Sequence, residues 1–331
     1  MKFLRFIGWL IVLIAALVFV LPLFLADYVE FSQETYIKAK PETVFRQVNN
    51  LKNWSNWSAW TNNDPDMQSE FNGPVSGKGS SHSWKSKQMG DGSMTITDSK
   101  AYSYVLSKLD FGTRGIVEDH WTFDQEADSV MVRWKFKAIN LTYPLGKLNG
   151  LVIKVMMRSY QRTGLSQLKT YCESLPEPAV VHEAMFDHQL AIMLDDSSRK
   201  AGIDKSIQQG LSKLFDQVAT LKLDTTGAPF AVFYNWDTTA FIHFRLGIPV
   251  VLEGTDTSKA SFFVHERGRS LTTVLSGPSE HTERYHYDIQ SYAIEKGYRF
   301  NGYPWELYLS NHNTTTDTSK WVSQVVYPVE K

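Results

Sequence analysis

The sequence contains a single cysteine, Cys172, among its 331 residues. An intrachain disulfide and a zinc site built on cysteine are therefore excluded. The surrounding segment LKTYCESL predicts a helix in which Cys172 is a small buried hydrophobic residue. Hydrophobic residues make up 43% of the chain and charged residues 21%, which is typical of a globular protein with no bias toward disorder.

An excess of positive charge is also missing. The chain has 34 Lys and Arg residues against 35 Asp and Glu residues. Binding of nucleic acid depends largely on a basic surface that neutralises phosphates. We therefore expect no nucleic-acid partner, and the sequence does not identify a protein partner.

The familiar catalytic and cofactor motifs are absent as well. Neither HExxH nor GxSxG occurs, and Gly77-Lys78-Gly79 lacks the ending and the following helix of a phosphate-binding loop. The nine histidines are scattered, and no pairing of the single cysteine with a histidine can be proposed. We expect no bound metal and no cofactor.

The first part of the chain has one long run without charge. The 21 residues from Phe6 to Ala26 could cross a hydrocarbon core of about 30 Å as a helix. Lys2 and Arg5 precede the run, which predicts a cytoplasmic N-terminus and soluble domains on the periplasmic side. A cleaved signal peptide and a buried core helix are the alternatives to a retained single-pass anchor.

The length predicts about two soluble domains, at roughly 100–200 residues each. We expect an anchor over 1–27, a first domain over 28–176 and a second over 177–331, with the proline-containing segment SLPEPAV between the two. Each part has its own pattern.

The first domain is predicted to be α+β. YVEFSQETYIKAK alternates as a strand does, and a helix is expected from Pro41, because proline fits a first turn and apolar residues then recur at helical spacing. Strand-like runs follow at 94–98, 102–109, 115–123 and 129–138, and a long helical pattern covers 148–173. A curved sheet holding a long helix leaves a cavity between the two for a ligand.

Several motifs of this domain resemble the START-like (SRPBCC, polyketide-cyclase type) family, in particular its membrane-tethered members. They are NWSNWSAW from Asn53, Asp64-Pro65-x-Met67, Gly77-Lys78-Gly79 followed by Trp84, GSMTI from Gly92, and TGLxxLK from Thr163. The resemblance implies a helix-grip fold and a pocket for apolar or amphipathic small molecules. Many members of this family only bind or carry a ligand.

The tryptophans Trp54, Trp57, Trp60 and Trp84 are the candidate ligand-binding residues of this domain. The first three are spaced by three residues at the end of the predicted helix, so they would lie at the mouth of the cavity. Packing at that mouth and contact with the membrane are the alternative roles.

Two charged segments carry weaker hypotheses. Glu118 and His120 share one face of a predicted strand, and we expect that face to be the solvated outer one rather than the cavity wall. Asp195-Asp196 in LDDSSRK is expected to be a charge pair at a helix N-terminus and not a catalytic dyad.

The second domain contains an internal repeat. GAPFAVF from Gly227 leads to GIPV from Gly247, and GYPWELY from Gly302 leads to VYPV from Val326. Each half is predicted to have a helix, preceded by a strand-like run at 180–186 or 261–264. Two strand–helix–strand–strand modules therefore predict a pseudo-twofold α+β domain, and such duplications commonly bind a ligand between their halves.

Glu306 breaks the symmetry of the repeat, because Ala231 occupies its place in the other half. An ionised carboxylate among aromatic residues is costly unless a charge pairs with it, and a cationic aromatic ligand would supply that charge and gain about 0.5–2 kcal/mol from ring faces. The alternative is a surface glutamate, because Trp305 and Glu306 point to opposite faces of a strand.

GYPWELY and the later segment DTSKWVSQVVYPV resemble the C-terminal part of the gyrase-inhibitor-like effector-binding domains. That resemblance implies a pocket for drug-like, often cationic, molecules, with its central acidic residue at Glu306. The candidate ligand-binding residues of this domain are Phe230, Phe233, Tyr303, Trp305, Glu306 and Tyr308.

Together these features predict a membrane-anchored protein that binds small molecules or lipids and senses, carries or sequesters amphiphilic ligands. A hydrolase with Glu306 as general acid or base is the alternative, and an interaction module without ligands is a third possibility. The sequence names neither ligand.

Overall fold

The computed structural model describes residues 2–59, 64, 66–87, 90–112, 115–187, 189–235, 240–252, 261–265, 267–277, 282–310 and 317–331. The chain divides into two compact units, Met1–Glu177 and Pro178–Lys331. Trp60, one of the candidate ligand-binding residues, lies outside the described residues.

The first unit begins with an apolar helical segment. Helix α1 (Lys2–Ala15) continues into a π-helical turn (Ala16–Val20) and a 3-10 turn (Leu21–Phe24). The 20 residues Arg5–Phe24 are long and apolar enough to cross a membrane, a property shared by membrane anchors and signal sequences.

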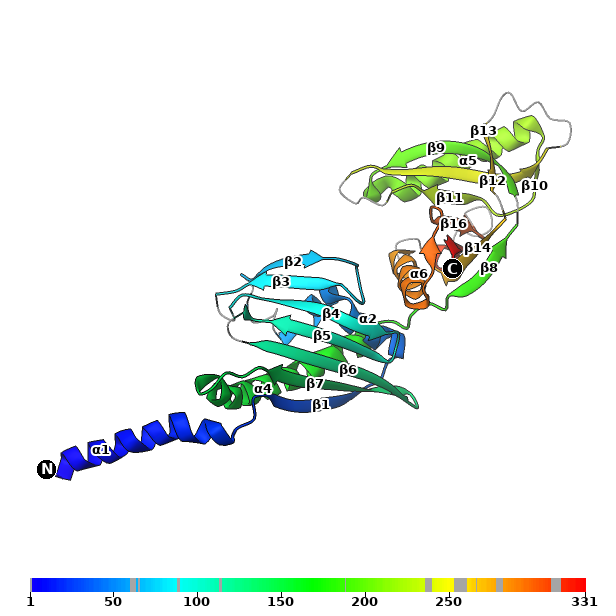
Figure 1. The fold of residues 1–331 in the computed structure, drawn as a ribbon. Coiled ribbons are helices and arrows are strands. Elements are labelled where there is room, and N and C mark those ends of the chain that lie inside the picture. The colour runs from blue at the N-terminus through cyan, green and yellow to red at the C-terminus, as the bar shows by residue number, and fades with distance from the viewer. Residues whose placement is uncertain are drawn as a thin grey trace. The chain divides into compact units, whose positions relative to one another are not determined.

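A seven-stranded antiparallel sheet follows, in the order β1-β7-β6-β5-β4-β3-β2 (Figure 1). Its strands are β1 (Val29–Ile37), β2 (Gln68–Asn72), β3 (Ser81–Lys85), β4 (Gly92–Lys100), β5 (Tyr104–Asp110), β6 (Ile116–Glu126) and β7 (Ser129–Ile139). Alternate residues of β6 and β7 are buried, as expected for a sheet with one face on a core.

Two helices pack on this sheet. Helix α2 (Pro41–Asn49) begins at its proline, which fits a first turn, and a 3-10 turn (Leu51–Asn56) follows it. Helix α4 (Leu145–Ser174) lies along the buried face of the sheet, and side chains of both helices share one core with the strands. The helix-grip arrangement expected for this unit is therefore present.

The second unit is built on a ten-stranded antiparallel sheet. Eight strands run in the order β13-β9-β12-β11-β16-β17-β14-β8, with β10 paired to β12 and β15 to β17. The strands are β8 (His182–Phe186), β9 (Gln189–Ser198), β10 (Asp224–Thr225), β11 (Phe230–Phe233), β12 (Ile242–Val251), β13 (Ser261–His265), β14 (Gly268–Ser276), β15 (Arg299–Phe300), β16 (Trp305–Tyr308) and β17 (Val322–Glu330). The helices are α5 (Ile203–Leu221) and α6 (Thr282–Lys296).

The strand order is symmetric about the central pair β11–β16, so the two halves are β9-α5-β11-β12 and β14-α6-β16-β17. The sequence prediction that 180–186 and 261–264 open the two halves was wrong. These runs form β8 and β13, and each pairs with the opening strand of the other half, β14 and β9. A local sequence pattern can identify a strand, but the strand it pairs with depends on contacts between segments that are far apart in the sequence.

Strand β9 also corrects the prediction for Asp195-Asp196. Both residues lie in β9 and not at a helix N-terminus. Asp195 faces Arg245 of β12 and accepts hydrogen bonds from its Nε at 2.6 Å and Nη2 at 3.0 Å. Asp196 accepts a hydrogen bond from Ser206 Oγ in the first turn of α5. Asp195 therefore connects β9 to β12, and Asp196 connects β9 to α5.

Candidate functional site

The first unit holds a cavity of about 350 Å³ between the sheet and α4. Its wall is mainly apolar and includes Val117, Phe136, Ala138, Ile153, Met156 and Met157. This volume falls in the usual range of small-molecule sites, about 300–1,000 Å³. An apolar wall of this kind suits the hydrocarbon part of a ligand.

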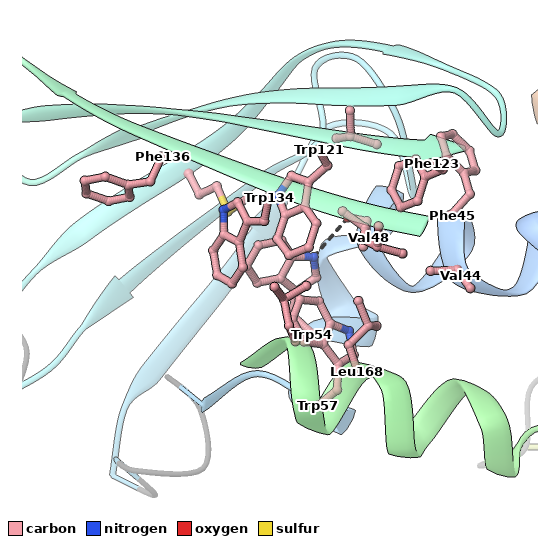
Figure 2. Packing of buried hydrophobic residues seen from close by; sticks show 14 of the residues in the cluster. Val44, Phe45, Val48, Trp54, Trp57, Trp121, Phe123, Trp134, Phe136 and Leu168 are labelled. Atoms are coloured by element: carbon pink, nitrogen blue, oxygen red, sulfur yellow. Dashed lines mark hydrogen bonds between the residues drawn. The ribbon is translucent and has the colours of Figure 1, made fainter. Parts of the chain in front are cut away.

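Trp54 and Trp57 lie in the core of the first unit (Figure 2). They are not among the residues that line the cavity. Their rings are 4.8 Å apart, and both contact the ring of Trp121, which stacks on Trp134 at 4.2 Å. Their indole nitrogens donate to backbone oxygens of α2, those of Val48 and Gln47. The structure thus places them as packing residues that fix α2 to the sheet.

Gly164 allows α4 to approach this tryptophan cluster. A Cβ atom at Gly164 would lie 3.4 Å from the Trp134 ring and 3.9 Å from the Trp57 ring. Trp84 lies elsewhere, half-buried on β3, where its indole nitrogen donates to the backbone oxygen of Gly90. The cluster and Trp84 are therefore separate features.

The outer face of β6 carries Glu118 and His120, which are exposed as expected. Asp119 between them points to the buried face, and burial raises the pKa of its carboxyl to about 7. Sequence reasoning missed this residue, although the buried alternation Val117, Asp119, Trp121 was the signal that could have identified it.

In the second unit, the structure separates the candidate residues onto two faces of the sheet. Trp305 stacks on Phe230 at 5.2 Å on one face. Trp305 lines a pocket of about 460 Å³ that also includes Tyr303 and Arg245. Glu306 belongs to the opposite face of β16, as strand alternation requires.

A second pocket of this unit, of about 470 Å³, is rich in aromatic residues. It is lined by Phe233, Tyr234, Tyr287, Phe300, Tyr303 and Tyr327, together with His286 and polar groups including Gln290. Tyr303 therefore borders both pockets, and Phe233 lines this one.

Glu306 lies behind the wall of the aromatic pocket and is only 4% exposed. His286 lines the pocket, and its Nε2 is 2.9 Å from Glu306 Oε1. Tyr308 donates a longer hydrogen bond, 3.4 Å, to Glu306 Oε2. Burial, and then the charge of Glu306, raise the pKa of Tyr308, so this phenol keeps its proton.

A chain of hydrogen-bonded side chains ends at Glu306. Gln290 Nε2 donates to the Tyr327 hydroxyl, which lies 2.9 Å from His286 Nδ1. When the Tyr327 hydroxyl donates to Nδ1 of a neutral His286, Nε2 carries the ring proton and donates it to Glu306. Burial raises the pKa of Tyr327 to about 12, so this hydroxyl is available as a donor. Sequence spacing gave no sign of this chain, because its members lie on α6, β16 and β17.

No described part of the chain brings together three or more His, Cys, Asp or Glu side chains that could hold a metal ion. Both nitrogens of His286 are engaged within the protein, and both oxygens of Glu306 have partners. The arrangement places a buried carboxyl group, bonded to a histidine, beside an aromatic pocket.

Comparison with solved structures gives matches of low identity. The C-terminal domain of EcmrR is 14% identical with a TM-score of 0.39, and the match covers 46% of this chain and 98% of that one. A hydrolase from Listeria innocua is 14% identical with a TM-score of 0.36, covering 49% and 98%. A protein from Thermus thermophilus is 17% identical with a TM-score of 0.34, covering 44% and 97%. None of the curated proteins matches the chain.

Comparison with protein families identifies the first unit. The model described as polyketide cyclase / dehydrase and lipid transport matches residues 28–173. This range covers the sheet, α2 and nearly all of α4, which are the elements that enclose the cavity. Residues 28–173 therefore form a domain of the polyketide cyclase / dehydrase and lipid transport family.

Proposed function

We propose that this protein is a membrane-anchored binder of lipid-like or other amphiphilic small molecules, which it senses, carries or sequesters. The observation that supports this function best is the apolar cavity between α4 and the sheet. A cavity lined by aliphatic and aromatic side chains favours the apolar part of a ligand by removing it from water, at roughly 25 cal/mol per Å² of buried apolar surface.

Filling the cavity tests this function. Ala138 lies on β7 in the cavity wall, so Ala138→Phe places a ring in the space of the ligand. We expect this variant to reduce retention of an octyl compound by at least about tenfold, because the ring excludes the chain. Full-length protein in nanodiscs is captured, bound octanol is extracted and measured, and the amount held by empty nanodiscs is subtracted.

Ala201→Phe is the matched control, because Ala201 is exposed in a 3-10 turn of the second unit. This control should bind octanol as the wild type does. Equal binding by wild type and Ala138→Phe would contradict a ligand site in the cavity.

The apolar helix is proposed to be a retained anchor, because its end is bonded to the rest of the first unit. The Tyr143 hydroxyl donates to the Phe19 oxygen at 2.7 Å, and Lys147 Nζ donates to the Leu25 oxygen at 2.7 Å. The backbone N–H of Leu141 also donates to the Asp27 oxygen. These bonds bring the start of α4 to the end of the apolar segment, where the membrane surface would be.

The first turns of α4 expose apolar side chains next to this junction. The exposed residues are Leu145, Leu151, Val152, Val155 and Met156. Two of them, Val152 and Met156, also line the cavity. An apolar patch of this kind marks a contact surface, and a bilayer is the partner that the adjoining anchor supplies.

A fluorophore attached at position 155 tests the membrane contact. Val155 is 73% exposed, whereas the native Cys172 is 1% exposed and should not react. We expect a bimane label on Val155→Cys in nanodiscs to be quenched by lipids that carry a nitroxide on their acyl chains. A label on Thr170→Cys, exposed further along the same helix, should not be quenched. Equal quenching at the two positions would contradict the contact.

The second unit is proposed to bind a cationic aromatic molecule in the pocket bordered by His286. Six aromatic residues line this pocket, and the buried carboxyl group of Glu306 contacts His286 in its wall. Ring faces and a buried carboxylate both favour a cation over a neutral molecule of the same shape. Hydrolysis with Glu306 as acid or base is less consistent with the geometry, because its oxygens are already bonded to His286 and Tyr308.

Removing the charge of Glu306 tests this second site. We expect Glu306→Gln to weaken binding of N-methyl-4-phenylpyridinium by about tenfold or more and to leave binding of neutral 4-phenylpyridine unchanged. Isothermal titration of both compounds against wild type and variant gives the comparison. If Glu306→Gln binds both compounds as tightly as the wild type does, or binds both more weakly by the same factor, the charge of Glu306 does not select the ligand.

A further inference from the structure

Unpartnered polar atoms gather in the buried part of the first unit. Among the described residues, the buried side-chain atoms without a hydrogen-bond partner belong to Gln47, Asn49, Ser107, Asp119, Trp121, Thr122, Trp134, Gln161 and Gln167. Buried polar groups are normally satisfied by protein or water, so each exception needs an explanation. Asp119 and Ser107 are the carboxyl and the hydroxyl of this set that lie directly opposite each other, on β6 and β5.

The register of the sheet sets their position. Asp119 of β6 is directly opposite Ser107 of β5 and, on its other side, directly opposite Phe136 of β7. Val117 lies two residues before Asp119 and therefore on the same face. Both Phe136 and Val117 line the cavity, so the Asp119–Ser107 pair adjoins its wall.

These two polar groups are removed from water. Each of the two residues is only 3% exposed, and neither Asp119 Oδ1 nor Ser107 Oγ has a hydrogen-bond partner. The Trp134 indole lies beside the carboxyl and partly offsets the effect of burial on its pKa, without making a hydrogen bond of good geometry. An acidic group in this setting is costly, because a buried carboxyl without a donor loses its hydration.

We propose that Asp119 and Ser107 bind the polar end of the ligand whose apolar part fills the cavity, and that this end is a hydrogen-bond donor, an amine or a hydroxyl. This inference rests on the proposed function of the cavity. The inference goes further by naming the chemical class of amphiphile that the cavity selects.

The chemistry of the pair sets this preference. The free oxygen of Asp119 accepts hydrogen bonds, and Ser107 can donate or accept one. A hydroxyl can donate to Asp119 and accept from Ser107, and an ammonium can donate to both. A ligand carboxylate or phosphate would place a second negative charge against Asp119, which low-polarity surroundings make strongly unfavourable.

Three octyl compounds that differ only in their polar end test the proposal: octylamine, octanol and octanoate. Full-length protein in nanodiscs is incubated with each compound at mildly alkaline pH, where Asp119 is largely ionised. Ligand retained above the level of empty nanodiscs is then measured. We expect octylamine to bind at least about tenfold more tightly than octanoate, with octanol between them.

Two variants link the preference to the pair. Asp119→Asn, which keeps the shape of the side chain, should remove the advantage of octylamine over octanoate. Ser107→Ala should weaken octanol binding about fivefold while keeping the advantage of the amine, because it removes one hydrogen bond and no charge. Circular dichroism checks that both variants keep the fold.

The outcomes separate this inference from the proposed function. One outcome would overturn the inference alone: all three compounds bind equally, bind less to Ala138→Phe, and bind to Asp119→Asn as they do to the wild type. The cavity would then bind amphiphiles, but Asp119 and Ser107 would not select among them. If octanoate binds best, the inference is also overturned. If no compound is retained above empty nanodiscs, both the inference and the proposed function are overturned.

Discussion

Trp57→Ala is expected to lower the free energy of unfolding of the first unit by about 4 kcal/mol, with the second unit unaffected. The side chain is 1% exposed and packs on Trp54 and Trp121, so its loss leaves a large cavity. Aromatic-to-alanine changes in well-packed cores cost about 3–5 kcal/mol. The lost hydrogen bond to the Gln47 oxygen also leaves a buried acceptor in α2 unpaired.

Chemical denaturation of the full chain, followed by near-ultraviolet circular dichroism, measures this effect, because the two units can unfold separately. Trp84→Ala is the matched control. Trp84 is half-buried and lies outside the cluster, so we expect it to cost about 2 kcal/mol or less. Equal losses for the two variants would show that the Trp57 cluster is not the centre of this core.

Asp119→Asn is expected to make the first unit more stable than wild type at neutral pH and about equally stable near pH 4. Burial raises the pKa of Asp119 from the usual 3.8 to about 7 in the folded state. Between these two values the folded protein holds a proton that the unfolded chain has released. The free energy of unfolding of the wild type therefore falls as pH rises through this window, and it levels off above the folded pKa.

The size of the change in unfolding free energy follows from the shift in the pKa of Asp119. About three pKa units correspond to at most about 4 kcal/mol, at 1.36 kcal/mol per unit. The measurement is the difference in unfolding free energy between Asp119→Asn and wild type as a function of pH, since other titrating groups cancel in the difference. A difference that stays constant between pH 4 and pH 8 would contradict a buried, protonated Asp119.

Much of the first unit could be predicted from local patterns. The alternation of Val29, Phe31 and Ile37 identified β1, and Pro41 identified the start of α2. The apolar spacing of 148–173 identified α4, which extends three residues further at its start, to Leu145. These features could be predicted because side-chain periodicity and first-turn proline act within a few residues.

The second unit shows where such patterns fail. The repeat of GAPFAVF and GYPWELY indicated two related halves, and β11 and β16 are indeed the central pair of the sheet. The strands that open the halves were nevertheless assigned wrongly, because β8 and β13 pair across to the other half. Pairing partners depend on contacts between distant segments, which no local pattern encodes.

The sequence by itself determined the apolar N-terminal segment, the two α+β units, the family of the first unit and the acidic residue that breaks the symmetry of the second. Tertiary structure alone decided which side chains meet. It brought His286 of α6 against Glu306 of β16, and it set Asp119 opposite Ser107 on the buried face of the sheet. The physical reason is that composition and periodicity are properties of neighbouring residues, whereas the burial and pairing of a charge depend on segments that only folding brings together.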